Sequence, residues 1–245
     1  DADLKIIEDL KNKNQLYNSE IIKHVYPFCW RCSTPLLYYA LDSWFIKTTA
    51  VKQQLLDDNQ KINWVPKTIK TGRMQNWFET LIDWNISRNR FWGTPLPVWV
   101  CDNGHQKVVG SMEELKRLSG EEISDLHRPF IDEMTFKCSE CESIMRRVPE
   151  VMDVWLDSGA MPFAQWHYPF ENREVFKEWY PADFIVEGND MTRGWFYTLM
   201  AEAMLIGEIP PAPFKNVIAT GMILDEFGKK MSKSRPETCI DPLEM

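Results

Sequence analysis

The sequence predicts an α/β fold built on a parallel sheet, with a zinc ribbon ahead of it, and three observations support this prediction. A short apolar run at 184–186 ends in turn residues and is followed by a helical pattern over 193–207. A second apolar run at 217–224 follows that helix, so strand and helix alternate as they do around a parallel sheet. Cysteine-bearing turns within 96–150 lie between short strand-like runs, which is the arrangement of a zinc ribbon.

The composition excludes several classes of protein. Of the 245 residues, 44% are apolar and 26% are charged, as in a globular protein, and the longest apolar runs are too short to span a membrane. The net charge of -8 argues against a general affinity for a nucleic-acid backbone, so any such contact must be local. No signal segment is visible, and the two Cys-x-x-Cys pairs favour metal binding in a reducing compartment, so we expect a cytoplasmic protein.

The chain divides into four predicted segments, each with its own pattern. A helix and a linker come first, followed by a connective segment, the zinc ribbon, and the strand–helix–strand part of the sheet. The boundaries of these segments are 1–23, 24–95, 96–150 and 151–245. Within the first two segments, we expect a helix over 1–14, β-like structure over 21–44, and short helices and loops over 45–90.

Cys29 and Cys32 lie on a predicted turn, with Pro27 and Pro35 on either side. A closed zinc site needs four ligands, so this pair must find two more elsewhere or remain unused. A redox function is disfavoured, because no thioredoxin-like strand and helix surround the pair. The two cysteines are therefore a possible half-site for a metal.

The ribbon segment carries a stronger metal signal, because Cys101 and His105 follow one strand and Cys138 and Cys141 follow another. Each pair sits at the tip of a predicted hairpin, so the four side chains can meet as a tetrahedral zinc site. An alternative set joins Cys138 and Cys141 to the cysteines at 29 and 32, and leaves the other two residues without a metal. Either set fills all four positions, so the zinc would be structural.

Turn residues follow the strand at 184–186, and a cationic loop at 230–234 follows the next strand. In open α/β sheets, ligands bind beyond the carboxyl ends of the strands, so both stretches would border one crevice. Gly188 lets the backbone approach a ligand closely. Asp190 can accept hydrogen bonds from a ribose, and it can also cap the helix that follows.

The loop at 230–234 places Lys230 and Lys233 three positions apart, within reach of one polyphosphate. Positive charge there would act most strongly on a departing pyrophosphate. The competing interpretation is a solvated surface loop, which is common for so short a basic stretch.

Four stretches resemble motifs of the class I aminoacyl-tRNA synthetases. The signature loop of that class is KMSKS, found here at 230–234. Motifs of the isoleucyl-tRNA synthetase family are similar to ISRNRFWG at 86–93, DVWLDSG at 153–159 and EGNDMTRGWF at 187–196. Together they cover most of 24–235 in the right order. The resemblance implies the second half of a class I synthetase Rossmann-type parallel sheet, plus connective-peptide insertions that include the zinc ribbon.

The resemblance also implies a role for each matching residue. Apolar side chains would read isoleucine, polar groups would hold the adenylate, and two lysines would stabilise the triphosphate during activation. The implied amino-acid pocket consists of Trp155, Met191 and Trp195, the ATP- or adenylate-binding residues are Glu187, Gly188, Asp190, Met231, Ser232 and Ser234, and the catalytic residues are Lys230 and Lys233. The implied partners are isoleucine, tRNA(Ile), and ATP with Mg²⁺, in a monomeric parent chain with structural Zn²⁺.

Two departures from the family pattern matter. Met191 stands where the family usually has Gln, so contacts to the bound aminoacyl group would differ. The family's His-x-Gly-His signature is missing, because none of His24, His105, His127 and His167 has that setting. We therefore expect a fragment that begins after the editing domain and is inactive alone.

Two alternatives stay open. A valyl- or leucyl-type synthetase would share most of these motifs, although the tryptophans at 155 and 195 favour isoleucine. A protein of another class, a zinc ribbon without activity, would contact RNA or protein through 96–150. Binding of an adenylate analogue distinguishes a synthetase of any specificity from a zinc-ribbon module, because a synthetase site would bind the analogue and the module would not.

Overall fold

The structure, a computed structural model, describes residues 2–29, 32–207, 212–225, 227–228 and 231. The chain forms two compact units, residues 1–42 and 43–245. Among the described helices, none is both long and apolar enough to cross a membrane.

The first unit begins with α1 (Ala2–Asn12), which confirms the predicted amino-terminal helix. The β-like interpretation of 21–44 is wrong, because the pairing in the described part of this stretch is the isolated bridge between Phe28 and Pro35. Ile21 is fully exposed, and the apolar residues near it, such as Ile22, Val25 and Leu37, are exposed as well. A strand pair without a buried face has little to stabilise it, which explains why β-type residues here form no sheet.

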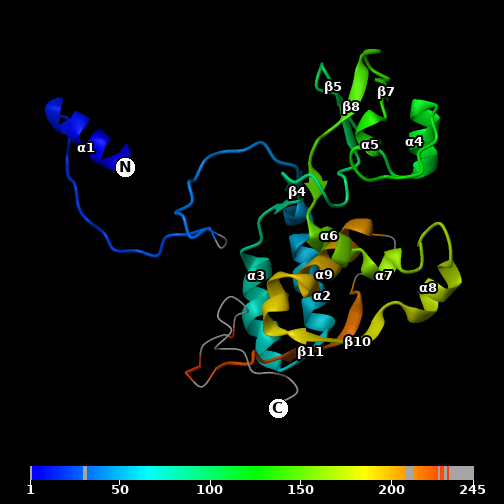
Figure 1. The fold of residues 1–245 in the computed structure, drawn as a ribbon. Coiled ribbons are helices and arrows are strands. Elements are labelled where there is room, and N and C mark those ends of the chain that lie inside the picture. The colour runs from blue at the N-terminus through cyan, green and yellow to red at the C-terminus, as the bar shows by residue number, and fades with distance from the viewer. Residues whose placement is uncertain (1, 30–31, 208–211, 226, 229–230, 232–245) are drawn as a thin grey trace. The chain divides into compact units, whose positions relative to one another are not determined.

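The second unit contains a parallel sheet in the order β10-β11-β2, of which Figure 1 labels β10 and β11. Its strands are β2 (Asn63–Val65), β10 (Ala182–Gly188) and β11 (Phe214–Thr220). The predicted strands at 184–186 and 217–224 are thus confirmed as parallel neighbours, although the second ends earlier than predicted. The sequence analysis missed β2, because three residues are too few to show an alternating pattern.

Helix α9 (Trp195–Ile206) packs on this sheet and confirms the helical pattern predicted over 193–207. The 3₁₀ turn η3 (Asn189–Arg193) precedes it, and Gly207 ends it with a left-handed φ of 71°. Most of α9 is buried, as expected of a helix that is apolar on all sides. Its core partners come from β2, β11, α2 (Lys52–Lys61) and α3 (Gln75–Glu79), and include Leu55, Trp64, Phe78 and Phe214.

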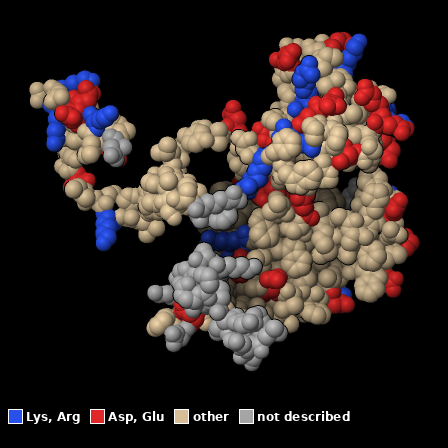
Figure 2. Space-filling view, in the orientation of Figure 1, with Lys and Arg blue, Asp and Glu red and all other residues tan. Residues whose placement is uncertain are grey.

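The ribbon segment folds around its own core, formed by residues such as Trp99, Leu115 and Met145. Its antiparallel sheet has the order β6-β5-β8-β7, which confirms the predicted strand pairs (Figure 1). On the face shown in Figure 2, acidic and basic side chains intermingle over this segment. Its elements are β5 (Val98–Cys101), β6 (Gln106–Val108), α4 (Met112–Ser119), α5 (Phe130–Glu133), β7 (Phe136–Lys137) and β8 (Ile144–Arg147).

Short elements connect the ribbon segment to the parallel sheet. Arg88 lies among them and pairs with the buried Asp153, with Nη2 2.6 Å from Oδ2. Arg88 therefore forms a packed ion-pair corner with Asp153. The connecting elements are β1 (Phe45–Ile46), η1 (Thr48–Val51), η2 (Ile69–Met74), β3 (Trp84–Asn85), β4 (Ser87–Arg88), β9 (Val151–Met152), α6 (Val154–Gly159), α7 (Met161–Ala164) and α8 (Arg173–Trp179).

Candidate functional site

The carboxyl ends of β10 and β11 lie at one edge of the parallel sheet, where Gly188 is in register with Thr220. The stretch 187–190 and the residues after Thr220 therefore leave the sheet at the same edge, as the predicted crevice requires. Met231 is half-buried. The predicted residues Lys230, Ser232, Lys233 and Ser234 lie outside the described part of the chain.

Gly188 and Asp190 come very close together at the end of β10. A Cβ atom on Gly188 would lie 2.7 Å from Oδ1 of Asp190, so a larger residue would displace that carboxylate. The Gly188 amide donates to Oε2 of Glu187 at 2.9 Å. The N-cap of η3 is Gly188 and that of α9 is Gly194, so Asp190 is not the helix cap that the sequence also allowed.

Trp155 of α6 and Trp195 of α9 both lie where these two helices pack together. The ring of Trp155 lies 3.1 Å from the position that a Cβ atom on Gly194 would occupy. The indole Nε1 of Trp195 donates to the Ser158 carbonyl at 3.1 Å. Met191 lies on the adjoining turn η3, and its partly buried side chain packs against the core between α9 and the parallel sheet. The three predicted pocket residues are thus on contiguous elements.

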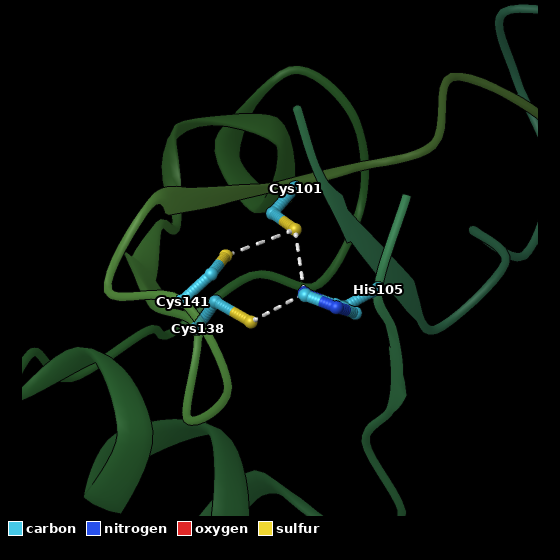
Figure 3. A group of neighbouring side chains, drawn as sticks. All are labelled: Cys101, His105, Cys138 and Cys141. Carbon is cyan, nitrogen blue, oxygen red and sulfur yellow. Dashed lines mark hydrogen bonds between the residues drawn. The ribbon is translucent and has the colours of Figure 1, made fainter. Parts of the chain in front are cut away.

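The four predicted metal ligands of the ribbon segment converge (Figure 3). Their ligand atoms all lie within 4.8 Å of one another. Sγ of Cys101 is 3.7 Å from Sγ of Cys141 and 3.5 Å from Nδ1 of His105. Sγ of Cys138 is also 3.5 Å from Nδ1 of His105. The structure therefore gathers the four residues of the predicted set.

Three of these separations match those around a tetrahedral zinc ion. With Zn–S bonds of about 2.3 Å and a Zn–N bond of about 2.0 Å, tetrahedral geometry places two sulfurs about 3.8 Å apart and sulfur and nitrogen about 3.5 Å apart. The distances from Cys101 to Cys141 and to His105 match both values. His105 presents Nδ1 to the cluster, while its Nε2 lies 3.7 Å from Glu140, an outer carboxylate of the kind that orients ligating histidines.

The electrostatics of the cluster also suit a cation. A hydrogen bond from the Ser143 side chain is the main cause that lowers the pKa of Cys141 to about 5, so this sulfur is a thiolate at neutral pH. The Glu140 amide lowers the pKa of Cys138, but burial and the neighbouring Cys141 and Cys101 thiols outweigh it and raise that pKa. Crowded thiols cannot all ionise unless a positive charge compensates them.

The turn at Cys29 has the same backbone hydrogen bonds as the turn at Cys138. In each, the cysteine amide donates to a carbonyl five residues on, of Thr34 or Ser143. In each, the cysteine carbonyl accepts from an amide four residues on, and that residue is left-handed, with φ of 57° at Ser33 and 59° at Glu142. Cys29, Ser33 and Thr34 therefore share the backbone hydrogen bonding of Cys138, Glu142 and Ser143.

Glu202 is not among the site residues predicted from the sequence. It is 9% exposed on α9, its Oε1 has no hydrogen-bond partner among the described residues, and desolvation, with Asp157 adding to it, raises its pKa to about 9. The available signal was an acid inside an otherwise apolar helical run, which by itself indicates no particular role.

The fold and the site define the class of protein. Of two neighbouring parallel strands, β10 ends in a glycine flanked by carboxylates, and a cysteine-bearing antiparallel sheet precedes both strands in the chain. The model of one family, tRNA synthetases class I (I, L, M and V), matches residues 2–245. The chain belongs to this family.

Within that class, similar curated proteins are isoleucine–tRNA ligases. The protein of Clostridium tetani is 51% identical over 246 residues, which cover 100% of this chain and 24% of that protein. The protein of Thermus thermophilus is 52% identical over 250 residues, with the same two shares. The chain thus spans about a quarter of the length of these relatives.

A solved structure shows the same fold at lower sequence identity. Mycobacterium tuberculosis methionyl-tRNA synthetase, in complex with methionyl-adenylate, superposes with a TM-score of 0.51 at 21% identity. The match covers 89% of this chain and 33% of that chain. The similarity supports the Rossmann-like α/β assignment.

Proposed function

We propose that this chain is part of the catalytic domain of an isoleucine–tRNA ligase, which activates isoleucine with ATP and transfers it to tRNA(Ile). The observation that carries the proposal is the continuous arrangement at the end of β10. There Gly188 and Asp190 lead through η3 to Trp195, which contacts α6 beside Trp155. An adenylate site and an apolar side-chain pocket would therefore be neighbours.

In the proposed first step, the isoleucine carboxylate attacks the α-phosphorus of ATP and pyrophosphate leaves, giving isoleucyl-adenylate. A tRNA ribose hydroxyl then attacks the isoleucyl carbonyl and AMP leaves. Catalysis of the first step rests on positioning and on charge stabilisation. Lys230 and Lys233 would stabilise the departing pyrophosphate, and Mg²⁺ would accompany ATP.

The roles of the described residues follow from their chemistry. Gly188 would let the adenylate approach the backbone, and Asp190 would accept from its ribose. Glu187, Met231, Ser232 and Ser234 would complete the nucleotide site. The faces of Trp155 and Trp195 would contact the aliphatic side chain, which offers a pocket nothing but dispersion and hydrophobic contact. Met191 would adjoin them.

We also propose that Cys101, His105, Cys138 and Cys141 hold a structural zinc ion and make the segment 96–150 a zinc ribbon. The match between their separations and a zinc tetrahedron supports this. Four protein ligands leave no open position on the metal, so it would stabilise the fold and take no part in the reaction. The pair at 29 and 32 would be half of a second site and need two further ligands.

The activity is proposed for a longer chain, since this one spans about a quarter of its relatives. The 245 residues alone are proposed to be inactive, because they lack a His-x-Gly-His motif. A cytoplasmic location, a monomeric parent and the four segment boundaries stay predictions.

Isoleucine-dependent ATP–pyrophosphate exchange by the longer chain tests the proposal. We expect exchange with isoleucine in preference to valine and leucine, and a loss of more than about 100-fold in Lys233→Ala. Lys215→Ala is the matched control, because this lysine is exposed on β11 and pairs with Asp183. No exchange with any of the three amino acids would contradict the proposal, and preferred exchange with valine or leucine would reassign the substrate.

A further inference from the structure

The Glu202 carboxyl group occupies an unusual place in the core. α9 carries no other charged residue, and Glu202 points its Oε1 atom into a region without a described hydrogen-bond partner. Burying a carboxyl without a partner is costly, so an ordinary structural role would be better filled by an apolar side chain. Burial holds the group as the neutral acid at physiological pH, because its pKa is about 9.

The carboxyl group lies in a slot made by Gly159, the last residue of α6. A Cβ atom on Gly159 would lie 2.0 Å from Oε1 of Glu202, 2.7 Å from its Cδ and 3.0 Å from Cβ of Thr198. Real side chains do not approach this closely, so any residue larger than glycine would collide with the carboxyl group. The side chain of Glu202 and the missing side chain of Gly159 are therefore complementary.

This contact adjoins the two tryptophans of the proposed amino-acid pocket. Ser158, next to Gly159, provides the carbonyl that accepts from Nε1 of Trp195. One turn earlier on α6, the Trp155 ring rests on Gly194. The spacing of α6 and α9 at Gly159 therefore affects both indole rings, since a close-packed interior transmits strain.

We propose that Glu202 is a positioning residue, whose carboxyl group fills the slot at Gly159 and so sets the placement of Trp155 and Trp195 for the amino-acid side chain. The inference rests on the proposed function. Glu202 itself need not touch the substrate. It controls the width of a pocket that must recognise a branched aliphatic side chain by contact alone.

The test compares Glu202→Ala, Gly159→Ala and the double variant in the full-length enzyme. We expect Glu202→Ala to raise the KM for isoleucine at least tenfold, with the KM for ATP and kcat within about threefold of the wild type. Glu202→Gln should keep the KM for isoleucine, the KM for ATP and kcat within about threefold of the wild type, because the amide has the same shape as the carboxyl group. Glu178→Ala, which removes an exposed acid on α8, is the control and should change nothing.

The combination tests the slot itself. We expect Gly159→Ala to raise the KM for isoleucine about tenfold in the wild type but less than about twofold in the Glu202→Ala background, where the methyl group meets no carboxyl. Additive effects, or an unchanged KM for isoleucine in Glu202→Ala, would overturn the proposal. So would a coupling seen in the unfolding temperature of the variants but not in the KM.

Failure of the proposed function gives a different result. In that case the wild type shows no ATP–pyrophosphate exchange. The unfolding temperatures of the wild type, the two single variants Glu202→Ala and Gly159→Ala, and the double variant still report whether Glu202 and Gly159 interact.

Discussion

The two Cys-x-x-Cys turns share one backbone geometry and differ in their surroundings. Cys138 is 1% exposed, on the hairpin of β7 and β8, and packs into the ribbon core. Cys29 is half-buried, and one isolated bridge, Phe28 to Pro35, lies beside it. The comparison teaches that local sequence makes the turn, whereas packing brings in the other ligands. Among the described residues, the turn at Cys138 is the one that has further potential metal ligands, Cys101 and His105, beside it.

The largest expected effect separates the two turns directly. Cys138→Ser should remove the bound zinc and destabilise the ribbon segment by at least about 3 kcal/mol, because a lost ligand leaves a buried site incomplete. Cys29→Ser should leave zinc content and unfolding unchanged in this chain. Metal analysis and thermal unfolding of both variants measure this. The distinction between the turns fails if Cys29→Ser loses the metal and Cys138→Ser keeps it.

Removal of the metal from the unmodified chain should affect the ribbon alone. A chelator should weaken amide-exchange protection in β5 and β8 by about 2–3 kcal/mol, while β10 and β11 keep theirs, because the two sheets have separate cores. Hydrogen exchange followed by mass spectrometry reports both sheets in one experiment. Equal loss of protection in the two sheets would show that the metal does not act locally.

Glu202 extends the comparison to another group whose chemistry is set by packing. Its folded pKa of about 9 lies above the unfolded value of 4.5, so between pH 5 and pH 8 the unfolded chain has lost a proton that the folded chain keeps. Stability should therefore fall with rising pH, by about 1.4 kcal/mol per pH unit relative to Glu202→Gln. Denaturant unfolding at several pH values measures the slope, and parallel curves for the two proteins would be the contrary result.

The smallest expected effect lies in the turns themselves. Glu142→Gly should stabilise the ribbon by about 0.5 kcal/mol, because glycine adopts the left-handed conformation without strain. Ser33→Gly removes the same backbone strain. It should leave the unfolding midpoint unchanged, because the described part of this turn is not packed into a core whose unfolding would report the gain. Matched unfolding curves decide this, and a larger gain for Ser33→Gly would reverse the interpretation.

The sequence predicted those features that depend on few residues. Cys101 and His105 lie on one predicted hairpin and Cys138 and Cys141 on another, so each hairpin places two ligands side by side; the pairing of β5 with β8, which was not predicted, then brings the two hairpins together. The parallel neighbours β10 and β11 followed from one strand–helix–strand pattern.

Other features depend on distant packing and were missed or wrong. The strand β2 exists because Trp64 fills the space between Phe196 and Phe214, residues far along the chain. The slot that receives Glu202 depends on α6 meeting α9, and neither helix shows this alone. The stretch 21–42 has β-type residues, but its described part finds no partner sheet within the first unit.

The wide separation of β2 and β11 along the chain has a consequence for how the protein folds. β2 joins the sheet through β11, and the side chains of Asn63 and Asn216, 153 positions apart, hydrogen-bond across that junction. Closing so long a loop is entropically slow, and on the ribosome it must wait until β11 has been made. The ribbon needs only contacts within 96–150, so it can assemble first, and pulse labelling during refolding should protect its amides before those of β2.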